Sequence, residues 1–487
     1  MSFSIRPWFV APVLLAFSVA WTIPGCGSGS SDDDEATPTP GTPVVTPTPG
    51  DDDATGDDDT VGDDDITEPP APTLPPNVLD TGNWYVPTHD RIEEFAEMNG
   101  GSVGVVNAPV AVVAWEDTAI FGSIAEATFR YQVFNLAFQI EPGLMEEIVP
   151  IAAGPTFDSP ATVTTLSPEF GEIPIADLQQ DILEDYNVLY YQAESLGCTP
   201  SDTEEGGAGN RDTCIPLDDL KTTESYKDFV AKFIYLYEGL KAHPDVGPGF
   251  TAPMIARLLG GYAEGVVQTM ARAAFDAERA LPIAVMTITS PNVGVVGSVS
   301  ATYRQGIRTI PEMEDLFNYL RRAGFDLWVV TSAAQPLVAA VANTVDTGYL
   351  VPSERVIGIE LELGRGVNPK LTTYLKSGEP VPWGPGKVDA IDQKIGKDPM
   401  FVFGATAGDY QMLTAYATQA LQVVINHNEG CPINQLYAIV ATGDIYRGEY
   451  LLQGVDENTG VFRSAQESIA LGQSSPTALP TTTDCSG

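Results

Sequence analysis

Five polar side chains lie directly after apolar runs or in short turns, where the side chains of binding sites are often exposed. They are Glu116, Thr118, Thr331, Lys387 and Asp409. Carboxyl groups can transfer protons or hold metal ions, whereas hydroxyl and ammonium groups bind anionic oxygens. What these residues can do together depends on whether one set of strands and helices brings them to the same place.

Four apolar runs without polar alternation predict buried strands. These runs are Ala108–Trp115, Leu327–Val330, Met400–Phe403 and Leu421–Ile425. The spacing of Met313, Leu316, Phe317 and Leu320 predicts a helix that follows proline. Strands that alternate with helices predict an α/β fold, with a parallel sheet covered by helices on both faces.

About two hundred residues separate the first predicted strand from the second, enough for a domain of their own. Four segments of this insertion have helical patterns: Ala176–Glu194, Ser225–Ala242, Ala252–Leu259 and Tyr262–Ala280. A short β-like piece follows at Ile283–Thr289 and Ser298–Tyr303. We therefore expect two lobes that share a cleft at the strand ends, where ligands bind in open α/β sheets.

Several segments resemble the motifs of the haloacid dehalogenase superfamily. The segment VVAWEDTAIFG at 112–122 is similar to its first motif, an apolar strand followed by Asp-x-Asp-x-Thr. The segments WVVTSA at 328–333, GPGKV at 384–388 and FGATAGDYQML at 403–413 resemble its second, third and fourth motifs. The segments IAEATF at 124–129 and QGVDENTG at 453–460 resemble its secreted phosphorylcholine- and phosphoserine-phosphatase-like members. The resemblance implies a Rossmann-like parallel core at 83–122 and 304–487, with a mostly helical cap at 123–303.

The resemblance also implies that the catalytic groups are missing. The nucleophilic aspartate of the family corresponds to Ala114 and its acid/base aspartate to Glu116, which is one methylene longer. In the fourth motif, an Mg²⁺-binding aspartate corresponds to Ala405, and Asp409 is a remnant. A misplacement of about 1 Å can cost 100-fold in rate. We therefore expect no catalytic residue, no metal site and no cofactor, with Mg²⁺ required if the protein is active after all.

By the same resemblance, Thr331, Lys387 and Thr118 would contact a phosphate. The sequence thus predicts a pseudophosphatase that binds a small phosphorylated or choline-like ligand or a surface partner. Two alternatives stay open: a working Mg²⁺-dependent phosphomonoesterase for substrates such as phosphorylcholine, and a surface scaffold without a small ligand. Trp115 and Phe121 could face a choline-like cation, although such aromatics more often belong to a core.

The N-terminus resembles a bacterial export signal. Residues 1–26 have a basic start, an uncharged apolar run and a lipobox-like end at Cys26, the predicted site of lipidation. Residues 27–82 repeat Asp triplets among Thr, Pro and Gly, so we expect a disordered linker. These features predict a lipoprotein of the cell envelope, in the periplasm or at the outer membrane, with the membrane as a partner through the anchor.

Charge and cysteine content narrow the function further. The chain has 24 basic and 66 acidic residues and a formal net charge of −42, which argues against nucleic acid as a partner. Four cysteines besides Cys26 allow three disulfide pairings in an exported protein. Because each pair encloses a local segment, we favour Cys198 with Cys214 and Cys431 with Cys485.

Overall fold

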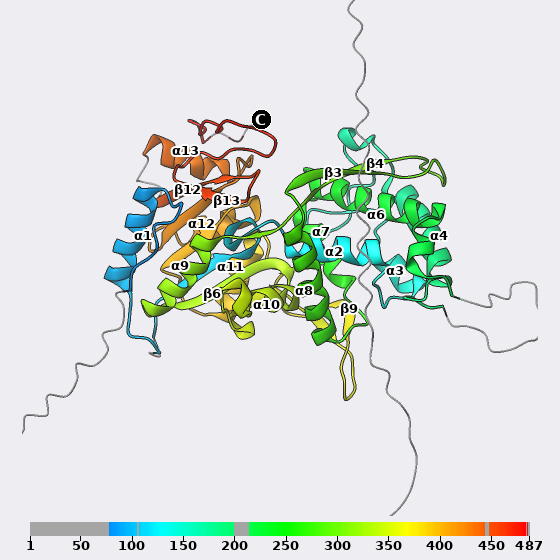
Figure 1. Cartoon of the computed structure of the whole chain (residues 1–487), viewed down its shortest axis with the longest axis horizontal. Helices are drawn as coiled ribbons and strands as arrows, with labels where there is room; N and C mark the ends of the chain where they lie inside the picture. The colour runs from blue at the N-terminus through cyan, green and yellow to red at the C-terminus, as the bar shows by residue number, and fades with distance from the viewer. Residues whose placement is uncertain (1–76, 105–106, 199–213, 444–447, 484, 486–487) are drawn as a thin grey trace, which may run out of the picture. The chain divides into compact units, whose positions relative to one another are not determined.

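The computed structural model describes residues 77–104, 107–198, 214–443, 448–483 and 485 (Figure 1). All of them belong to one compact unit, Leu74–Gly487. The predicted signal sequence, Cys26 and nearly all of the predicted linker lie outside the described residues. In the described part of the chain, no helix is both long and apolar enough to cross a membrane.

A seven-stranded sheet forms the centre of this unit, in the order β13-β12-β11-β10-β1-β6-β7. Only β13 runs antiparallel to its neighbour. The strands are β1 (Val110–Ala114), β6 (Asp326–Ala334), β7 (Val356–Ile359), β10 (Phe401–Gly404), β11 (Leu421–Asn426), β12 (Tyr450–Asp456) and β13 (Val461–Arg463). The predicted α/β class with a mostly parallel sheet is therefore confirmed.

All five residues of β1 are buried, because helices cover both faces of the sheet. Ala111 and Val113 face one apolar cluster, whereas Val110, Val112 and Ala114 face another. Three helices cover the first face: α1 (Val86–Asn99), α9 (Pro311–Arg322) and α10 (Gln335–Ala342). Three others cover the second face: α11 (Pro385–Lys394), α12 (Tyr410–Ala415) and α13 (Asn434–Thr442). Burial on both faces explains why these strands appear in the sequence as unbroken apolar runs.

The chain between β1 and β6 is mostly helical, and we call its elements from Ile124 to Gln305 the cap region (Figure 1). Its helices are α2 (Ile124–Asn135), α3 (Pro142–Ile148), α4 (Ile175–Tyr190), α5 (Leu217–Leu220), α6 (Glu224–Ala242), α7 (Pro248–Arg257) and α8 (Glu264–Ala280). An antiparallel hairpin of β3 (Ala284–Thr289) and β4 (Ser300–Gln305) ends the region. The exact boundaries of a cap domain stay a prediction.

Two further two-stranded sheets complete the fold. In the first, β2 (Ile120–Phe121), just after β1, pairs with β5 (Arg308–Thr309), just after the cap region. This pairing brings the start and the end of the cap region together. In the second, β8 (Leu361–Leu363) pairs with β9 (Leu371–Leu375).

Both favoured disulfides are present: Cys198 bonds to Cys214, and Cys431 bonds to Cys485. The folded contacts also begin before the predicted domain start near Asn83. Leu79 is 1% exposed, and its N–H donates to Glu93 Oε1 in α1. The chain is thus packed against the domain from at least Leu79.

A buried ion cluster joins α4, α6 and the loop of the β3–β4 hairpin. Lys232 Nζ lies 2.7 Å from Asp181 and 2.7 Å from Asp228 and donates to the Val293 carbonyl. Asp181 in turn accepts hydrogen bonds from the N–H groups of Val295 and Val296. A lysine buried this deeply is stable only with such partners, because removing one partner would leave an uncompensated buried charge.

Asp185 adds a third carboxyl group to this cluster. Burial and a hydrogen bond with Asp228 raise its pKa to about 8. Asp228 Oδ1 is buried and has no hydrogen-bond partner in the described part of the chain. The folded state therefore holds a proton on Asp185 that the unfolded chain loses near its ordinary pKa of 3.8.

This proton makes stability depend on pH. Because the folded pKa of Asp185 is raised, the folded state binds more protons than the unfolded state between about pH 4 and pH 8, and stability falls as pH rises through that window. We expect Asp185→Asn, which replaces the O–H donor of the protonated carboxyl with an N–H donor that does not titrate, to remove this fall. Melting temperatures across pH 4–9 test this, with the exposed Asp158→Asn as control. A parallel decline in wild type and Asp185→Asn would contradict it.

Candidate functional site

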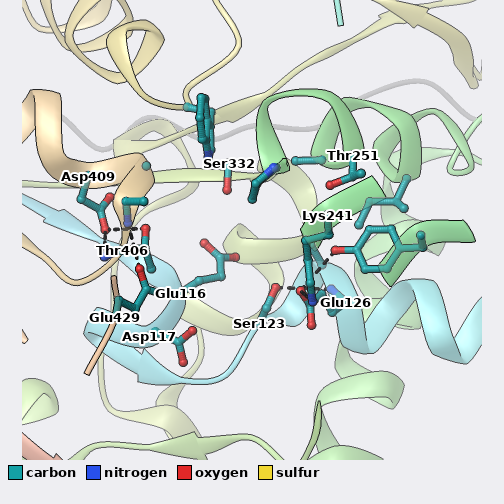
Figure 2. A pocket seen from close by; sticks show the side chains of 18 of the residues that line it. Glu116, Asp117, Ser123, Glu126, Lys241, Thr251, Ser332, Thr406, Asp409 and Glu429 are labelled. Carbon is teal, nitrogen blue, oxygen red and sulfur yellow. Dashed lines mark hydrogen bonds and ion pairs between the residues drawn. The ribbon is translucent and has the colours of Figure 1, made fainter. Parts of the chain in front are cut away.

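The candidate site lies at the carboxyl ends of the central strands. Strand β1 lies between β6, which follows it in the chain, and β10, which begins the other half of the sheet. Loops that leave β1 and β10 therefore diverge, and ligands bind at such a switch point in open parallel sheets. A cavity of about 380 Å³ lies here, lined by residues of the strand-end loops and of the cap region. Figure 2 shows the two groups on opposite sides of the cavity.

Strand β1 ends at Ala114, which is 1% exposed. The turn that follows it contributes two carboxyl groups to the cavity, those of Glu116 and Asp117. Its second carboxyl residue, Asp117, has a left-handed backbone with φ 51°. The Asp117 carboxylate accepts from Gly122 N at 2.9 Å and from the Arg304 guanidinium at 2.8 and 3.0 Å. Burial opposes its ionisation, but Arg304 and the other partners hold the pKa of Asp117 below its ordinary value. Asp117 is thus a charged residue that links this turn to the cap region.

Glu116 is held by the neighbouring strand. Its Oε2 accepts a 2.6 Å hydrogen bond from Thr331 Oγ1, which itself accepts from Ala333 N. The other oxygen, Oε1, is buried and has no hydrogen-bond partner in the described part of the chain. Burial raises the pKa of Glu116 to about 7, against the opposing effects of Thr331 and Lys387. At neutral pH this carboxyl is therefore partly protonated.

Lys387 and Asp409 form a buried ion pair of 2.5 Å, with side chains that are 5% and 1% exposed. Asp409 Oδ2 also accepts from the N–H groups of Ala405 and Thr406 and from the Thr406 hydroxyl. These bonds fix the loop after β10. The lysine charge is therefore compensated, and Asp409 has a structural role whatever else it does.

The structure brings four of the five predicted residues to one place: Glu116, Thr331, Lys387 and Asp409. Thr331 is fully buried and acts on the cavity through Glu116. Thr118 is also fully buried, is not among the residues that line the cavity, and has no hydrogen-bond partner for Oγ1 in the described part of the chain. The phosphate-binding roles of Thr331, Lys387 and Thr118 stay predictions.

Glu429 was missed by the sequence analysis. It follows β11, a strand that the sequence did predict, so its position at a strand end was the available signal. Its Oε2 accepts from Ala407 N at 3.0 Å. Burial, with the negative charge of Asp117 next in importance, raises the pKa of Glu429 to about 7. The cavity thus contains two carboxyl groups, Glu116 and Glu429, that are partly protonated at neutral pH.

The cap region contributes a second charged cluster, which no sequence motif indicated. Lys241 lies 2.9 Å from Glu126 and 2.8 Å from Glu238, and the Tyr237 hydroxyl donates to Glu126. Arg130 joins this cluster at 3.7 Å from Glu126. The three basic residues that line the cavity, Lys241, Arg304 and Lys387, are therefore all ion-paired.

The residues present do not fit the Mg²⁺ site of the family that the motifs resemble. Among the described residues, no group of three or more His, Cys, Asp or Glu could hold a metal ion. Asp117 is paired with Arg304, Asp409 is paired with Lys387, and Ala405 has no ligand atom in its side chain. The expectation that no cofactor is needed nevertheless stays a prediction.

Trp115 and Phe121 belong to the core rather than to the cavity. Trp115 is fully buried and packs edge-on against Tyr349, and Phe121 is buried beneath the Arg304 guanidinium. The aromatic side chains that do line the cavity are Tyr237, from the cap region, and Trp383, from the loop before α11.

The raised pKa of Glu429 predicts a pH effect on stability. Because the folded state keeps a proton that the unfolded chain loses near pH 4.5, stability falls as pH rises from about 4.5 to about 7. Glu429→Gln cannot ionise, so its melting temperature relative to wild type should increase across this window. Thermal unfolding at pH 4.5 and pH 8 measures the difference, with exposed Glu146→Gln as control. If the difference does not change with pH, the Glu429 carboxyl titrates normally.

Comparison with known proteins agrees with the fold. Residues 252–414 match the model of the haloacid dehalogenase-like hydrolase family, a stretch that includes Thr331, Lys387 and Asp409 but not Ala114 or Glu116. No curated protein matches the sequence. The crystal structure of a conserved protein of unknown function from Anaerococcus prevotii DSM 20548 is similar in fold, with a TM-score of 0.67 and 23% identity. The similarity covers 80% of this chain and 98% of that one. Residues 252–414 are thus similar to the haloacid dehalogenase-like hydrolase family, and the mostly parallel sheet agrees with a core of that type.

Proposed function

We propose that this chain is a non-catalytic binding protein built on a haloacid dehalogenase-like phosphatase fold. The observation that carries the proposal is the combination of a formed cavity with alanine at the two positions, 114 and 405, where the resemblance requires aspartate. The surrounding parts of the site are ordered, since Glu116 is bonded to Thr331 and Lys387 to Asp409. The architecture of a site is present without its reacting groups.

Without a nucleophile, the site cannot reach the rate acceleration that hydrolysis of a phosphate monoester requires. Hydrolysis of a phosphate monoester can require up to about 10²¹-fold acceleration. A site that has lost its reactive groups typically retains only about 10³–10⁴-fold from binding and electrostatics. Alanine at position 114 offers no atom that could attack phosphorus.

Glu116 does not replace the missing group. Burial raises the pKa of this carboxyl to about 7, so it is partly protonated at neutral pH, and its Oε2 accepts a hydrogen bond from the Thr331 hydroxyl. A nucleophilic carboxylate must be ionised and directed at the reacting atom. The position and protonation of Glu116 therefore support ligand contact rather than attack.

The cavity supports the binding of a small molecule. Its volume of about 380 Å³ lies within the range of small-molecule sites, and its lining combines charged residues with Trp383 and Tyr237. A small phosphorylated or choline-like ligand is the class that the sequence predicts. We further propose that Cys26 anchors the protein to the cell envelope through lipid. The two disulfides are compatible with an exported location.

We expect the full chain to release no p-nitrophenol from p-nitrophenyl phosphate above background, with or without Mg²⁺. The triple variant Ala114→Asp, Glu116→Asp, Ala405→Asp should gain Mg²⁺-dependent activity, because it restores the carboxyl groups of the resembled motifs. Ala176→Asp, at an exposed position on α4, is the matched control and should stay silent.

Two results would contradict the proposal. Mg²⁺-dependent hydrolysis by the wild type that Glu116→Gln abolishes would establish a working phosphomonoesterase. A triple variant as silent as the wild type would show that positions 114, 116 and 405 do not correspond to the family's catalytic aspartates.

A further inference from the structure

We infer that the cavity binds an organic cation with N–H donors, such as a primary ammonium group, and that Glu116 and Glu429 are its ligands. This inference rests on the proposed binding function, and its ligand differs from the phosphorylated or choline-like class that the sequence predicts. The positive charge of the ligand would then lie at the strand-end side of the cavity, where the resemblance to the haloacid dehalogenase motifs implies a phosphate.

The positive charges that line the cavity all have partners. Lys387 is paired with Asp409, Arg304 with Asp117, and Lys241 with both Glu126 and Glu238. An anionic ligand would have to compete with these carboxylates for each cation. Among the described residues that line the cavity, every ammonium or guanidinium group already has a carboxylate partner, so none is left for an anionic ligand.

The negative charges are not all paired. Five carboxyl groups line the cavity, and three of them belong to the ion pairs above. Glu116 and Glu429 form no ion pair within 4 Å among the described residues, and each accepts a hydrogen bond from a neutral group, the Thr331 hydroxyl or Ala407 N. The charge that lacks an ion-pair partner at the cavity is therefore negative, which favours a cationic ligand.

The unpartnered oxygen of Glu116 specifies the kind of cation. Oε1 is buried and accepts no hydrogen bond in the described part of the chain, and buried polar atoms normally have a hydrogen-bond partner. A ligand that supplies an N–H group satisfies this atom and neutralises its charge at once, because hydrogen bonds between ionised groups are the strong ones. A quaternary ammonium carries the charge but has no hydrogen to donate.

The size and lining of the cavity favour an organic molecule over a metal ion. About 380 Å³ exceeds the space that a single ion needs, and no group of three ligating residues is present among the described residues. Apolar contact is available from Ile255 and Pro248 in the cap region and from the rings of Trp383 and Tyr237. A ligand with an ammonium end and a carbon body fits both sides of the cavity.

The free protein bears a cost for these two residues, which supports a functional reason for their presence. Burial raises the pKa of both Glu116 and Glu429 to about 7, so ionising them at neutral pH opposes folding. Carboxyl groups that are costly to the fold and that line a cavity are typical of functional sites. A bound cation would offset this cost.

The test is binding of n-butylamine to the full chain at pH 8, measured by calorimetry and by the shift in melting temperature. Butylammonium should raise the melting temperature in a saturable manner. Tetramethylammonium, n-butanol and inorganic phosphate should bind at least about tenfold more weakly, a difference that corresponds to about 1.4 kcal/mol. Glu116→Gln and Glu429→Gln should each weaken butylammonium binding at least about tenfold, whereas Glu146→Gln should leave it unchanged.

The outcomes separate this inference from the proposed function. Absence of butylammonium binding, or binding that both Glu→Gln variants retain, overturns the inference even if the protein is inactive as a phosphatase. Saturable binding of phosphate or Mg²⁺ alone that exceeds butylammonium binding also overturns it. Because Gln replaces Glu at nearly equal volume and removes an ionisation penalty, both variants should remain folded, which circular dichroism checks.

Discussion

The position of β1 in the middle of a parallel sheet is the constraint on which the candidate site depends. Its two neighbours, β6 and β10, belong to different halves of the sheet, so loops from both halves meet at its carboxyl end. Glu116 follows β1, Thr331 lies in β6, Asp409 follows β10 and Glu429 follows β11. Of these, Glu116, Asp409 and Glu429 line one cavity, although the first and the last are more than three hundred positions apart. The cap region covers this cavity because the chain leaves and re-enters the core at the β2–β5 pair.

Ion pairing divides the buried charges of this protein into two groups. In the first, each charge is compensated within the fold, as in the Lys232 cluster of the cap region and the Lys387–Asp409 pair. Such pairs stabilise local geometry, because losing one partner would leave a buried charge exposed to a low dielectric. The second group consists of Glu116 and Glu429, which form no ion pair within 4 Å among the described residues and whose pKa values burial raises. We interpret the first group as structural and the second as the part of the site that a ligand completes.

Much of the fold could be predicted from the sequence because its strands are buried on both faces. The predicted runs at 108–115, 327–330, 400–403 and 421–425 correspond to β1, β6, β10 and β11. By contrast, β7 and β13 were not predicted, and β12 was seen only as part of a resembled motif. Four helices of the cap region, α4, α6, α7 and α8, were predicted because each has an apolar pattern of helical spacing, whereas α2, α3 and α5 were not predicted in this way.

The candidate site was predictable where a motif indicated it and not elsewhere. Glu116, Thr331, Lys387 and Asp409 were all found through their order along the chain. Lys241 and Arg304 lie in the cap region, and only folding brings them to the cavity, so their sequence neighbours did not distinguish them from surface charges. The compensation of Lys387 by Asp409 was likewise invisible, and it changes the expected ligand: a lysine already paired is a weaker anion site than the motif suggested.

A crystal of the full chain soaked with O-phosphoethanolamine and Mg²⁺ would test the account most directly, because this molecule carries both a phosphate and an ammonium group. The account predicts an intact ligand whose ammonium nitrogen lies within hydrogen-bond distance of Glu116 and Glu429, with the phosphate directed away from Lys387. A phosphate bound at Lys387 and Thr331, or electron density for cleaved products, would contradict it.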